Sequence, residues 1–299
     1  MRVLVAIDGS APAGLAVDLV ANIGWPAGSE ILVAEAVESE AAVFVGPWPA
    51  LAVDHADRIE DEMRAAAQET VDDGCRHLAR PGLTVNTAVL SGRPASAIVD
   101  RARGMSADLI VLGSRGHGTI EAMLLGSVSA EVVDHAPAPV LVARTPRFGR
   151  VVLAWDGSSC ASRAAELLRS WPIFARSQVR VVTVVDIEPA WWSGFPTPGA
   201  AEASAMYLDA AEATRLHYDE MAREMAGRLR VAGLAADAER RDGDAATELI
   251  SAAAACNADL IVLGTHGRTG LARLVIGSVA RNVVHHASCS VLIVREGRR

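Results

Sequence analysis

A spacing of glycines that is able to hold an anion occurs twice in the sequence. In its first occurrence the pattern G-x-x-G-x9-G-[ST] is formed by Gly113, Gly116, Gly126 and Ser127. Glycine lets the backbone come close to a ligand because no side chain stands in the way. Ser127 suits the N-cap of a following helix, whose first N–H groups and positive dipole end attract phosphate. The pattern therefore predicts a phosphate site built from main-chain amides.

The second occurrence of the pattern is formed by Gly264, Gly267, Gly277 and Ser278. It lies inside a longer repeat, because residues 107–144 and residues 258–295 agree without a gap at about half of their positions. A structural loop copied by duplication explains two copies, but it does not explain why the residues between the glycines diverged while the glycines stayed. We therefore interpret the chain as a tandem duplication with one anion site in each half.

Charged side chains stand close to both patterns. Asp8 and Asp156 each follow the first apolar run of a half. A carboxylate there can accept hydrogen bonds from ribose hydroxyls or help to hold a phosphate-bound Mg²⁺, and the alternative of a helix N-cap stays open. Arg115 in the first loop can pair with phosphate. The second loop offers other candidate residues instead: His266, Arg268 and Arg273.

The elements that must position these residues alternate between strands and helices. Short apolar runs predict strands in the first half at residues 2–7, 29–37, 83–90, 108–112 and 140–143. They predict strands in the second half at residues 151–155, 179–185, 259–263 and 291–294. Apolar residues at helical spacing predict helices at residues 10–23, 57–78, 205–231 and 242–255, one that opens at Pro94 and one that ends at Trp171. The Pro- and Gly-containing residues 39–54 and 188–203 are expected to be loops.

This alternation implies a parallel sheet with right-handed crossovers in each half. In such a sheet, ligands bind beyond the carboxyl ends of the strands, where the strand order reverses. Because Asp8 and the first glycine pattern each follow a strand, we expect them to meet in that crevice. The same argument brings Asp156 together with the second pattern.

Composition excludes several classes of protein. The 299 residues contain no lysine, so a Walker A loop, a pyridoxal phosphate Schiff base and the protein-kinase signature are all excluded. A net charge of −8 and a pI near 5.5 argue against a nucleic-acid surface. The apolar runs are shorter than the ~20 residues of a membrane span. Because the first residues lead straight into the fold, we expect a cytoplasmic protein without a leader peptide.

Histidines and cysteines offer weaker candidates for chemistry. His285 and His286 are neighbours, and adjacent residues on a helix point about 100° apart, so they would chelate a metal poorly. His117 lies within the first glycine loop and is the better candidate for a role. Four cysteines lie far apart without a C-x-x-C pair, which favours buried thiols over a disulfide or zinc framework. No G-x-S-x-G or H-E-x-x-H motif suggests hydrolytic chemistry.

The chain resembles a tandem universal stress protein over essentially all of both halves. The glycine pattern resembles the mark of the ATP-binding branch of that family, and VAIDGS and VLAWDGS resemble its first strand. The resemblance implies an α/β fold with two tandem doubly wound domains, residues 1–146 and 147–299, each with a five-stranded parallel sheet like that of the adenine nucleotide alpha-hydrolases. It also implies that the last strands pair the two domains as a pseudo-dimer. Pairing of two chains is left open.

The resemblance implies ATP as the ligand, with or without Mg²⁺, and a set of contact residues in each half. In the first half it implies contacts from Asp8, Val37, Gly113, Arg115, Gly116, Gly126, Ser127, Val128 and Ser129. In the second half it implies contacts from Asp156, Val185, Gly264, His266, Gly267, Gly277, Ser278 and Val279. Val37 and Val185 would meet adenine through their backbone groups. His266 stands where the first half has Arg115, and Ala280 where it has Ser129, so the two sites need not bind with equal affinity.

Three functional hypotheses follow from the sequence. The first is a stress or signalling protein that holds ATP in one or both halves and acts through its conformation or its choice of partner. It is expected to hydrolyse ATP slowly at most, because no residue is an evident base for water. The second is a pseudo-dimeric scaffold whose phosphate loops hold no ligand. The third is a flavin carrier, which a colourless preparation would rule out.

Overall fold

Strands and helices alternate along both halves of the chain. The structure, a computed structural model, describes residues 1–38, 49–116, 125–187, 200–267 and 276–295, with the backbone alone at residues 49–57, 200 and 201. The strands of the first half are β1 (Arg2–Ala6), β2 (Ser29–Val37), β3 (Leu83–Ser91), β4 (Leu109–Gly113) and β5 (Val140–Ala143). Those of the second half are β6 (Arg150–Ala154), β7 (Gln178–Val185), β8 (Ala235–Asp242), β9 (Leu260–Gly264) and β10 (Ser290–Val294).

The helices follow the same duplicated order. In the first half they are α1 (Ala11–Asn22), α2 (Pro49–Leu78), α3 (Pro94–Gly104) and α4 (Ser127–His135). In the second half they are α5 (Ser159–Ser170), α6 (Ala200–Val231), α7 (Ala245–Ala255) and α8 (Ser278–His286), with a short 3-10 turn, Pro172–Phe174, after α5. Each helix therefore connects two strands, as the alternation predicted.

All of these strands belong to one ten-stranded sheet, in the order β3-β2-β1-β4-β5-β10-β9-β6-β7-β8. Neighbouring strands are parallel within each half. The halves join through β5 and β10, which pair antiparallel with Leu141 opposite Leu292. This confirms the predicted α/β fold of two tandem doubly wound halves whose last strands pair. The strand order reverses between β1 and β4, and again between β6 and β9.

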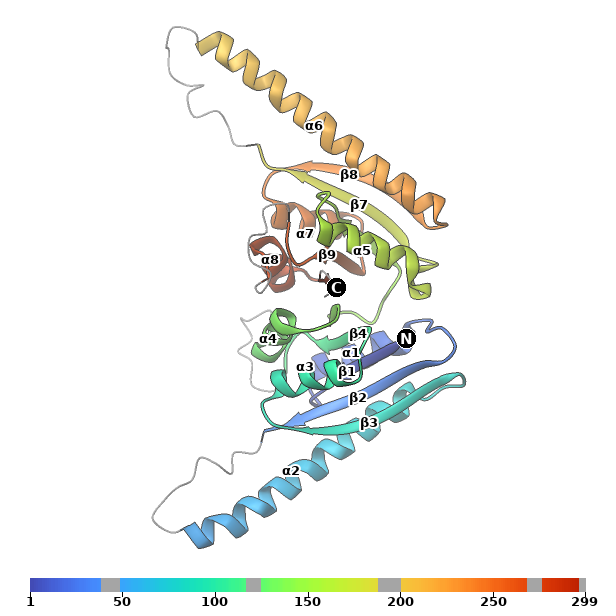
Figure 1. Ribbon diagram of the computed structural model, residues 1–299, viewed down its shortest axis with the longest axis vertical. Coiled ribbons are helices and arrows are strands. Elements are labelled where there is room, and N and C mark those ends of the chain that lie inside the picture. Colours follow the sequence, from blue (N-terminus) through green and yellow to red (C-terminus); the bar gives the residue numbers. More distant parts are fainter. Residues whose placement is uncertain (39–48, 117–124, 188–199, 268–275, 296–299) are drawn as a thin grey trace.

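Helices cover both faces of the sheet because side chains alternate along each strand. In β1, Val3 and Val5 belong to one core, and Leu4 and Ala6 belong to the other. Helices α1, α2, α5 and α6 contribute residues to the first core, whereas α3, α4, α7 and α8 contribute to the second. Figure 1 shows the two halves lying one after the other along the long axis of the molecule, with α2 and α6 at its opposite ends.

The long helices begin earlier than the sequence analysis expected. Helix α2 starts at Pro49 and α6 at Ala200, so the prediction of loops at residues 39–54 and 188–203 is wrong for the last residues of each range. An amphipathic pattern marks the part of a helix that packs and does not locate the residue at which the helix begins. Figure 1 shows both helices projecting beyond the sheet. In the described part of the chain no helix combines the length and the apolarity of a membrane span.

The sequence did not predict β8, the third strand of the second half. Its residues, AADAERRD, are mostly polar and none of them is fully buried. It pairs with β7 alone, at the outer edge of the sheet. An edge strand buries little surface and therefore lacks the apolar signature by which the other strands are recognised.

Candidate functional site

A cavity lies at the carboxyl edge of the sheet in each half. Site 1 is the cavity of about 350 Å³ beside the ends of β1 and β4. Site 2 is the cavity of about 260 Å³ beside the ends of β6 and β9. Both lie at the reversal of strand order, which is the expected place for a ligand in this class of fold. Small-molecule sites usually have volumes of roughly 300–1,000 Å³. The volume of site 1 lies within this range, and that of site 2 lies slightly below it.

Most of the predicted contact residues line these cavities. In site 1 they are Asp8, Gly113, Arg115, Gly116, Gly126, Ser127, Val128 and Ser129. In site 2 they are Asp156, Gly264, His266, Gly267, Gly277, Ser278 and Val279. Val37 and Val185 are buried and are absent from the linings, and their carbonyls accept hydrogen bonds from Gly92 N–H at 3.0 Å and Gly243 N–H at 2.9 Å. A carbonyl has a second lone pair, so a backbone contact from either valine stays a prediction.

The first glycine of each pattern is required by packing inside the protein. A Cβ atom at Gly113 would lie 2.6 Å from the carbonyl oxygen of Pro12, at the start of α1. At Gly264 it would lie 2.5 Å from Cβ of Cys160, in the first turn of α5. The expectation that Gly113 leaves room for a ligand is therefore wrong, because the space that its missing side chain leaves is filled by a helix.

The second glycine of each pattern makes room for an aspartate. A Cβ atom at Gly116 would collide with Oδ2 of Asp8, and one at Gly267 would lie 2.9 Å from Oδ2 of Asp156. The glycine therefore lets the carboxylate lie directly against the loop that follows β4 or β9. One carboxylate in each half is fixed at the boundary between the loop and the cavity.

The same aspartates shape the turn that starts the first helix of each half. Oδ1 of Asp8 accepts hydrogen bonds from Ser10 N–H at 3.1 Å and from Ser10 Oγ at 2.6 Å, and Oδ1 of Asp156 accepts one from Ser158 N–H at 3.0 Å. The N-cap residues are Ser10 and Ser158, so the interpretation of the aspartates as N-caps is wrong. Their carboxylates hold the loop and are placed to contact a ligand as well.

The third glycine of each pattern, and not the serine, is the N-cap residue of the next helix. Gly126 precedes α4 and Gly277 precedes α8, and each has an extended conformation. Gly126 N–H donates to Ser114 O at 2.8 Å, and Gly277 N–H donates to Thr265 O at 2.7 Å. These bonds make the glycine the last loop residue. The predicted N-cap role of Ser127 is therefore wrong, since Ser127, like Ser278 in the second half, is the first residue of its helix.

The first turns of α4 and α8 keep their N–H groups available. The first intrahelical bond of α4 runs from Ala130 N–H to Gly126 O at 2.9 Å, so the amides of residues 127–129 have no partner within the helix. No side chain of the described residues caps α4 or α8. The side chains of Ser10, Ser158 and Asp244 cap α1, α5 and α7, whereas α3, like α4 and α8, has no side-chain cap among the described residues. The two motif helices thus present uncapped amides to a cavity, which is the arrangement of an anion site.

The loops also bring one nitrogen-bearing side chain to each cavity. The Nε atom of Arg115 in site 1 is buried without a hydrogen-bond partner among the described residues. So is the Nε2 atom of His266 in site 2, whose Nδ1 lies 3.1 Å from Thr265 Oγ1. A buried polar atom without a partner costs free energy unless a ligand or water satisfies it. The two residues therefore place a polar side chain in the wall of each cavity, with the unpartnered nitrogen itself shielded from it.

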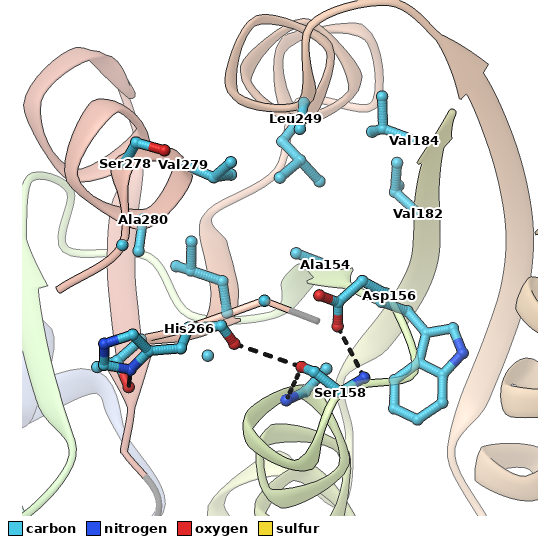
Figure 2. A pocket seen from close by; sticks show the side chains of 18 residues that line it. Ala154, Asp156, Ser158, Val182, Val184, Leu249, His266, Ser278, Val279 and Ala280 are labelled. Carbon is cyan, nitrogen blue, oxygen red and sulfur yellow. Dashed lines mark hydrogen bonds between the residues drawn. The ribbon is translucent and has the colours of Figure 1, made fainter. Parts of the chain in front are cut away.

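Apolar residues form the remaining wall of each cavity, and the sequence analysis did not assign them. Figure 2 shows Leu249, Val182 and Val184 on one side of site 2, with Val279 and Ser278 on the other. In site 1 the corresponding wall contains Ala36, Pro94 and Ile98. Each set joins a strand, β2 or β7, to the helix α3 or α7. The apolar spacing of these segments indicated that they pack in the core. It did not indicate that some of their residues also line a cavity.

Other candidates from the sequence stand apart from the two sites. His117, Arg268 and Arg273 lie outside the described residues. His285 and His286 lie at the end of α8, with their ring centres 6.3 Å apart, and the pKa of His285 is lowered, chiefly by burial. No group of three or more potential metal ligands occurs among the residues that the structure describes. All four cysteines are free thiols.

Comparisons with known proteins agree with the geometry. The profile of the Universal stress protein family matches residues 1–144 and again residues 147–295. A universal stress protein from Thermus aquaticus is 35% identical over 143 residues, which cover 48% of this chain and 97% of the relative. Another from Mycobacterium tuberculosis is 26% identical over 232 residues, which cover 72% of this chain and 70% of the relative.

A solved structure extends the likeness to the whole chain. The crystal structure of a universal stress protein from Archaeoglobus fulgidus covers 98% of this chain and 98% of its own, with a TM-score of 0.68 at 19% identity. At that identity the likeness shows the fold alone. Fold and sites together define an α/β protein with two related cavities. By its two family matches, the chain belongs to the universal stress protein family, as a tandem of two such domains.

Proposed function

We propose that the chain binds ATP in both halves and acts in the cytoplasm, in stress response or signalling, through a nucleotide-dependent conformation or choice of partner. The observation that carries this proposal is the uncapped first turn of α4 and of α8 at the edge of a cavity. Phosphate suits these amides because they supply several donors and the positive end of a helix dipole.

The parts of a nucleotide match the parts of each site. The phosphates are assigned to the amides of residues 127–129 and 278–280, next to Arg115 or His266. The base is assigned to the apolar wall, where Ile98 in site 1 and Leu249 in site 2 lie. The ribose then lies between them, near Asp8 or Asp156, whose carboxylate can accept hydrogen bonds from its hydroxyls. If Mg²⁺ accompanies the phosphates, these aspartates supply the oxygen ligands that it prefers and neutralise part of its charge.

We do not propose efficient hydrolysis. Phosphoryl transfer needs a residue that orients the attacking water and donors that stabilise the transferring group. The amides and Arg115 can serve the second task, but the assigned carboxylates are engaged in loop hydrogen bonds. The nucleotide is therefore proposed to act by being held.

A second candidate function is a pseudo-dimeric scaffold with no nucleotide. The contacts of Gly113, Gly116, Gly264 and Gly267 favour it, because packing within the protein accounts for each of these glycines. Packing does not account for the first-turn amides of α4 and α8, which no side chain of the described residues caps. The two candidates differ in one measurable property, the binding of ATP.

The test is a titration with ATP, with and without Mg²⁺, of the wild type and of Gly126→Asp and Gly277→Asp. Asparagine and aspartate are both good N-cap residues of nearly equal size, so Gly126→Asn and Gly277→Asn are the matched controls for charge. The wild type is expected to bind two equivalents and each aspartate variant one, because the new carboxylate repels phosphate. The asparagine variants report the part of the loss that comes from the added side chain.

Protein purified without added nucleotide supplies an independent readout. We expect the supernatant of heat-denatured wild type to contain adenine nucleotide, and less of it from each aspartate variant. A wild type that binds no ATP at millimolar concentration contradicts the proposal and leaves the scaffold. Equal losses in the aspartate and asparagine variants contradict the assignment of phosphate to these helix ends.

A further inference from the structure

The helix that supplies the amides of each site ends against an arginine of the other half. Arg295, which follows β10, donates from Nη2 to Val133 O at 3.1 Å and to Asp134 O, both in the last turn of α4. Arg144, which follows β5, donates from Nη2 to Val284 O in the last turn of α8. The two contacts are equivalent under the duplication, because Val133 and Val284 occupy the same place in the repeat. We call Arg144 and Arg295 the crossed arginines.

These contacts are electrostatically matched to the helix ends. The last four carbonyls of a helix have no intrahelical partner and carry the negative end of its dipole. Burial lowers the pKa of Arg144 to about 10, which is still well above neutral pH, and it also lowers the pKa of Arg295. A buried cation needs compensating acceptors, and the carbonyls of the opposite half supply them.

Each crossed arginine also belongs to the interface that joins the halves. Arg144 N–H donates to Ser290 Oγ of β10 at 3.1 Å. Beside Arg295, Asp134 of α4 forms an ion pair with Arg281 of α8 at 3.6 Å. The interface thus fixes the carbonyl ends of both helices at once. Since α4 and α8 have nine residues each, the fixed end lies within three turns of the amides that face the cavity.

We propose that Arg295 and Arg144 are positioning residues for the anion site of the opposite half: Arg295 for site 1 through α4, and Arg144 for site 2 through α8. The proposal rests on the proposed nucleotide binding at these helices. A cation at the carbonyl end stabilises the helix and fixes the place of its amino end, where the phosphates are bound. It follows that neither half alone has a fully formed site, which gives the tandem arrangement a function beyond duplication.

The test measures ATP affinity at one site at a time in the full chain. Site 1 is measured on the Gly277→Asp background and site 2 on the Gly126→Asp background. Arg295→Gln is expected to weaken site 1 about two- to fivefold, which is the effect of a charge at a helix end, and to leave site 2 unchanged. Arg144→Gln is expected to do the reverse. Arg295→Lys and Arg144→Lys keep the charge and are expected to restore most of the affinity.

The control is Arg169→Gln, since Arg169 forms an ion pair with Glu166 on the surface of α5 and contacts neither site. It is expected to change neither affinity. An effect that falls on the site of the same half, an equal effect on both sites, or no effect overturns the proposal. A purely structural role in joining the halves would produce the equal loss, so the crossed pattern distinguishes positioning from pairing.

Amide hydrogen exchange separates failure of this proposal from failure of nucleotide binding. Without any nucleotide, Arg295→Gln is expected to speed exchange in α4 and not in α8, and Arg144→Gln to do the opposite. If the wild type binds no ATP but exchange shows the crossed pattern, the proposed function fails while the helix contacts stand. Unchanged exchange in the opposite helix overturns the positioning role on its own.

Discussion

The two sites share a backbone and differ in some of the side chains that line them. The contacts that the glycines make recur in both halves, from the close approach of the first helix to the N-cap of the motif helix. Asp8, Ser127 and Val128 have identical counterparts in site 2. Arg115, however, is replaced by His266 and Ser129 by Ala280. The comparison teaches that the glycine pattern encodes the shape of the crevice, whereas the residues between the glycines determine how strongly each crevice binds.

The glycines that the halves share provide the largest expected effect. Gly113→Ala and Gly264→Ala each place a Cβ atom within 2.6 Å of atoms in the first helix of the half. We expect each variant to lose about 3 kcal/mol of unfolding free energy, the upper range for overpacking. Urea denaturation followed by circular dichroism measures the loss.

Gly14→Ala is the control for this prediction. Its Cβ atom would meet nothing within 4 Å, and alanine is preferred to glycine inside a helix by up to about 1 kcal/mol. It should therefore stabilise the protein slightly. If Gly113→Ala keeps its full stability and loses only ATP affinity, the glycine serves the ligand, and the packing argument for the shared pattern is wrong.

The exchange of arginine for histidine predicts that the two sites bind ATP with different affinities. The planar guanidinium of an arginine offers five N–H donors and can bond two phosphate oxygens at once, whereas an imidazole ring offers two nitrogens at most. Since a hydrogen bond to a charged group contributes about 1.5–3 kcal/mol, we expect site 1 to bind ATP about tenfold more tightly than site 2. Titrations on the single-site backgrounds, at constant ionic strength, measure both affinities.

Exchanging the two side chains tests the assignment. Arg115→His should weaken ATP binding at site 1, and His266→Arg should strengthen it at site 2. If both variants keep the wild-type affinities, the difference between the sites needs another cause.

Comparison with the sequence shows where prediction succeeded. The buried strands were recognised because apolar residues run through them without interruption, as in the LIVLG of both β4 and β9. The crevice was located because the glycine patterns follow these central strands. Pairing of β5 with β10 followed from the family resemblance, since nothing in either strand alone specifies its partner.

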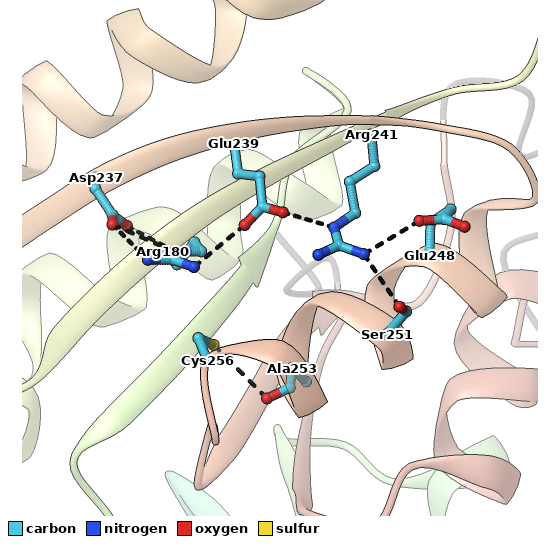
Figure 3. A network of polar contacts seen from close by, with 8 residues as sticks. All are labelled: Arg180, Asp237, Glu239, Arg241, Glu248, Ser251, Ala253 and Cys256. Carbon is cyan, nitrogen blue, oxygen red and sulfur yellow. Dashed lines mark hydrogen bonds and ion pairs between the residues drawn. The ribbon is translucent and has the colours of Figure 1, made fainter.

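Strand β8 shows what the pattern could not reveal. Its charges are neutralised across the sheet, which only the pairing reveals (Figure 3). Arg180 of β7 binds Asp237 at 2.8 Å and Glu239 at 3.3 Å, and Arg241 binds Glu239 at 2.7 Å and Glu248 of α7 at 3.3 Å. Opposite charges on neighbouring strands stabilise an edge that hydrophobic periodicity does not mark.

The prediction of the N-cap was wrong for a related reason. Serine is preferred at the N-cap, and Ser127 follows the loop, so propensity favoured it. Which residue becomes the N-cap of α4 depends on the hydrogen bond from Gly126 N–H to Ser114 O. This bond joins residues on either side of the loop. The same loop geometry places the amides at the cavity. Moving the N-cap by one residue, from Ser127 to Gly126, therefore does not change which helix end faces the cavity.

The smallest predicted effect concerns the hydroxyl that distinguishes Ser129 from Ala280. Ser129 Oγ donates to Gly113 O at 2.8 Å in a buried position and so ties α4 to the end of β4. We expect Ser129→Ala to lower the unfolding free energy by about 1 kcal/mol, the usual contribution of one such bond. Ala280→Ser, with the equivalent carbonyl of Gly264 as acceptor, should recover part of that amount in the second half.

Urea denaturation again provides the measurement, with Ser127→Ala as the control. Ser127 is an exposed neighbour on the same helix, and exposed substitutions usually change stability by less than about 0.5 kcal/mol. An equal loss in Ser127→Ala and Ser129→Ala would show that the bond to Gly113 contributes little. The first turn of α4 carries the amides assigned to site 1, so loosening it should also weaken ATP binding at site 1 and leave site 2 unaffected. A general loss of stability would affect both sites.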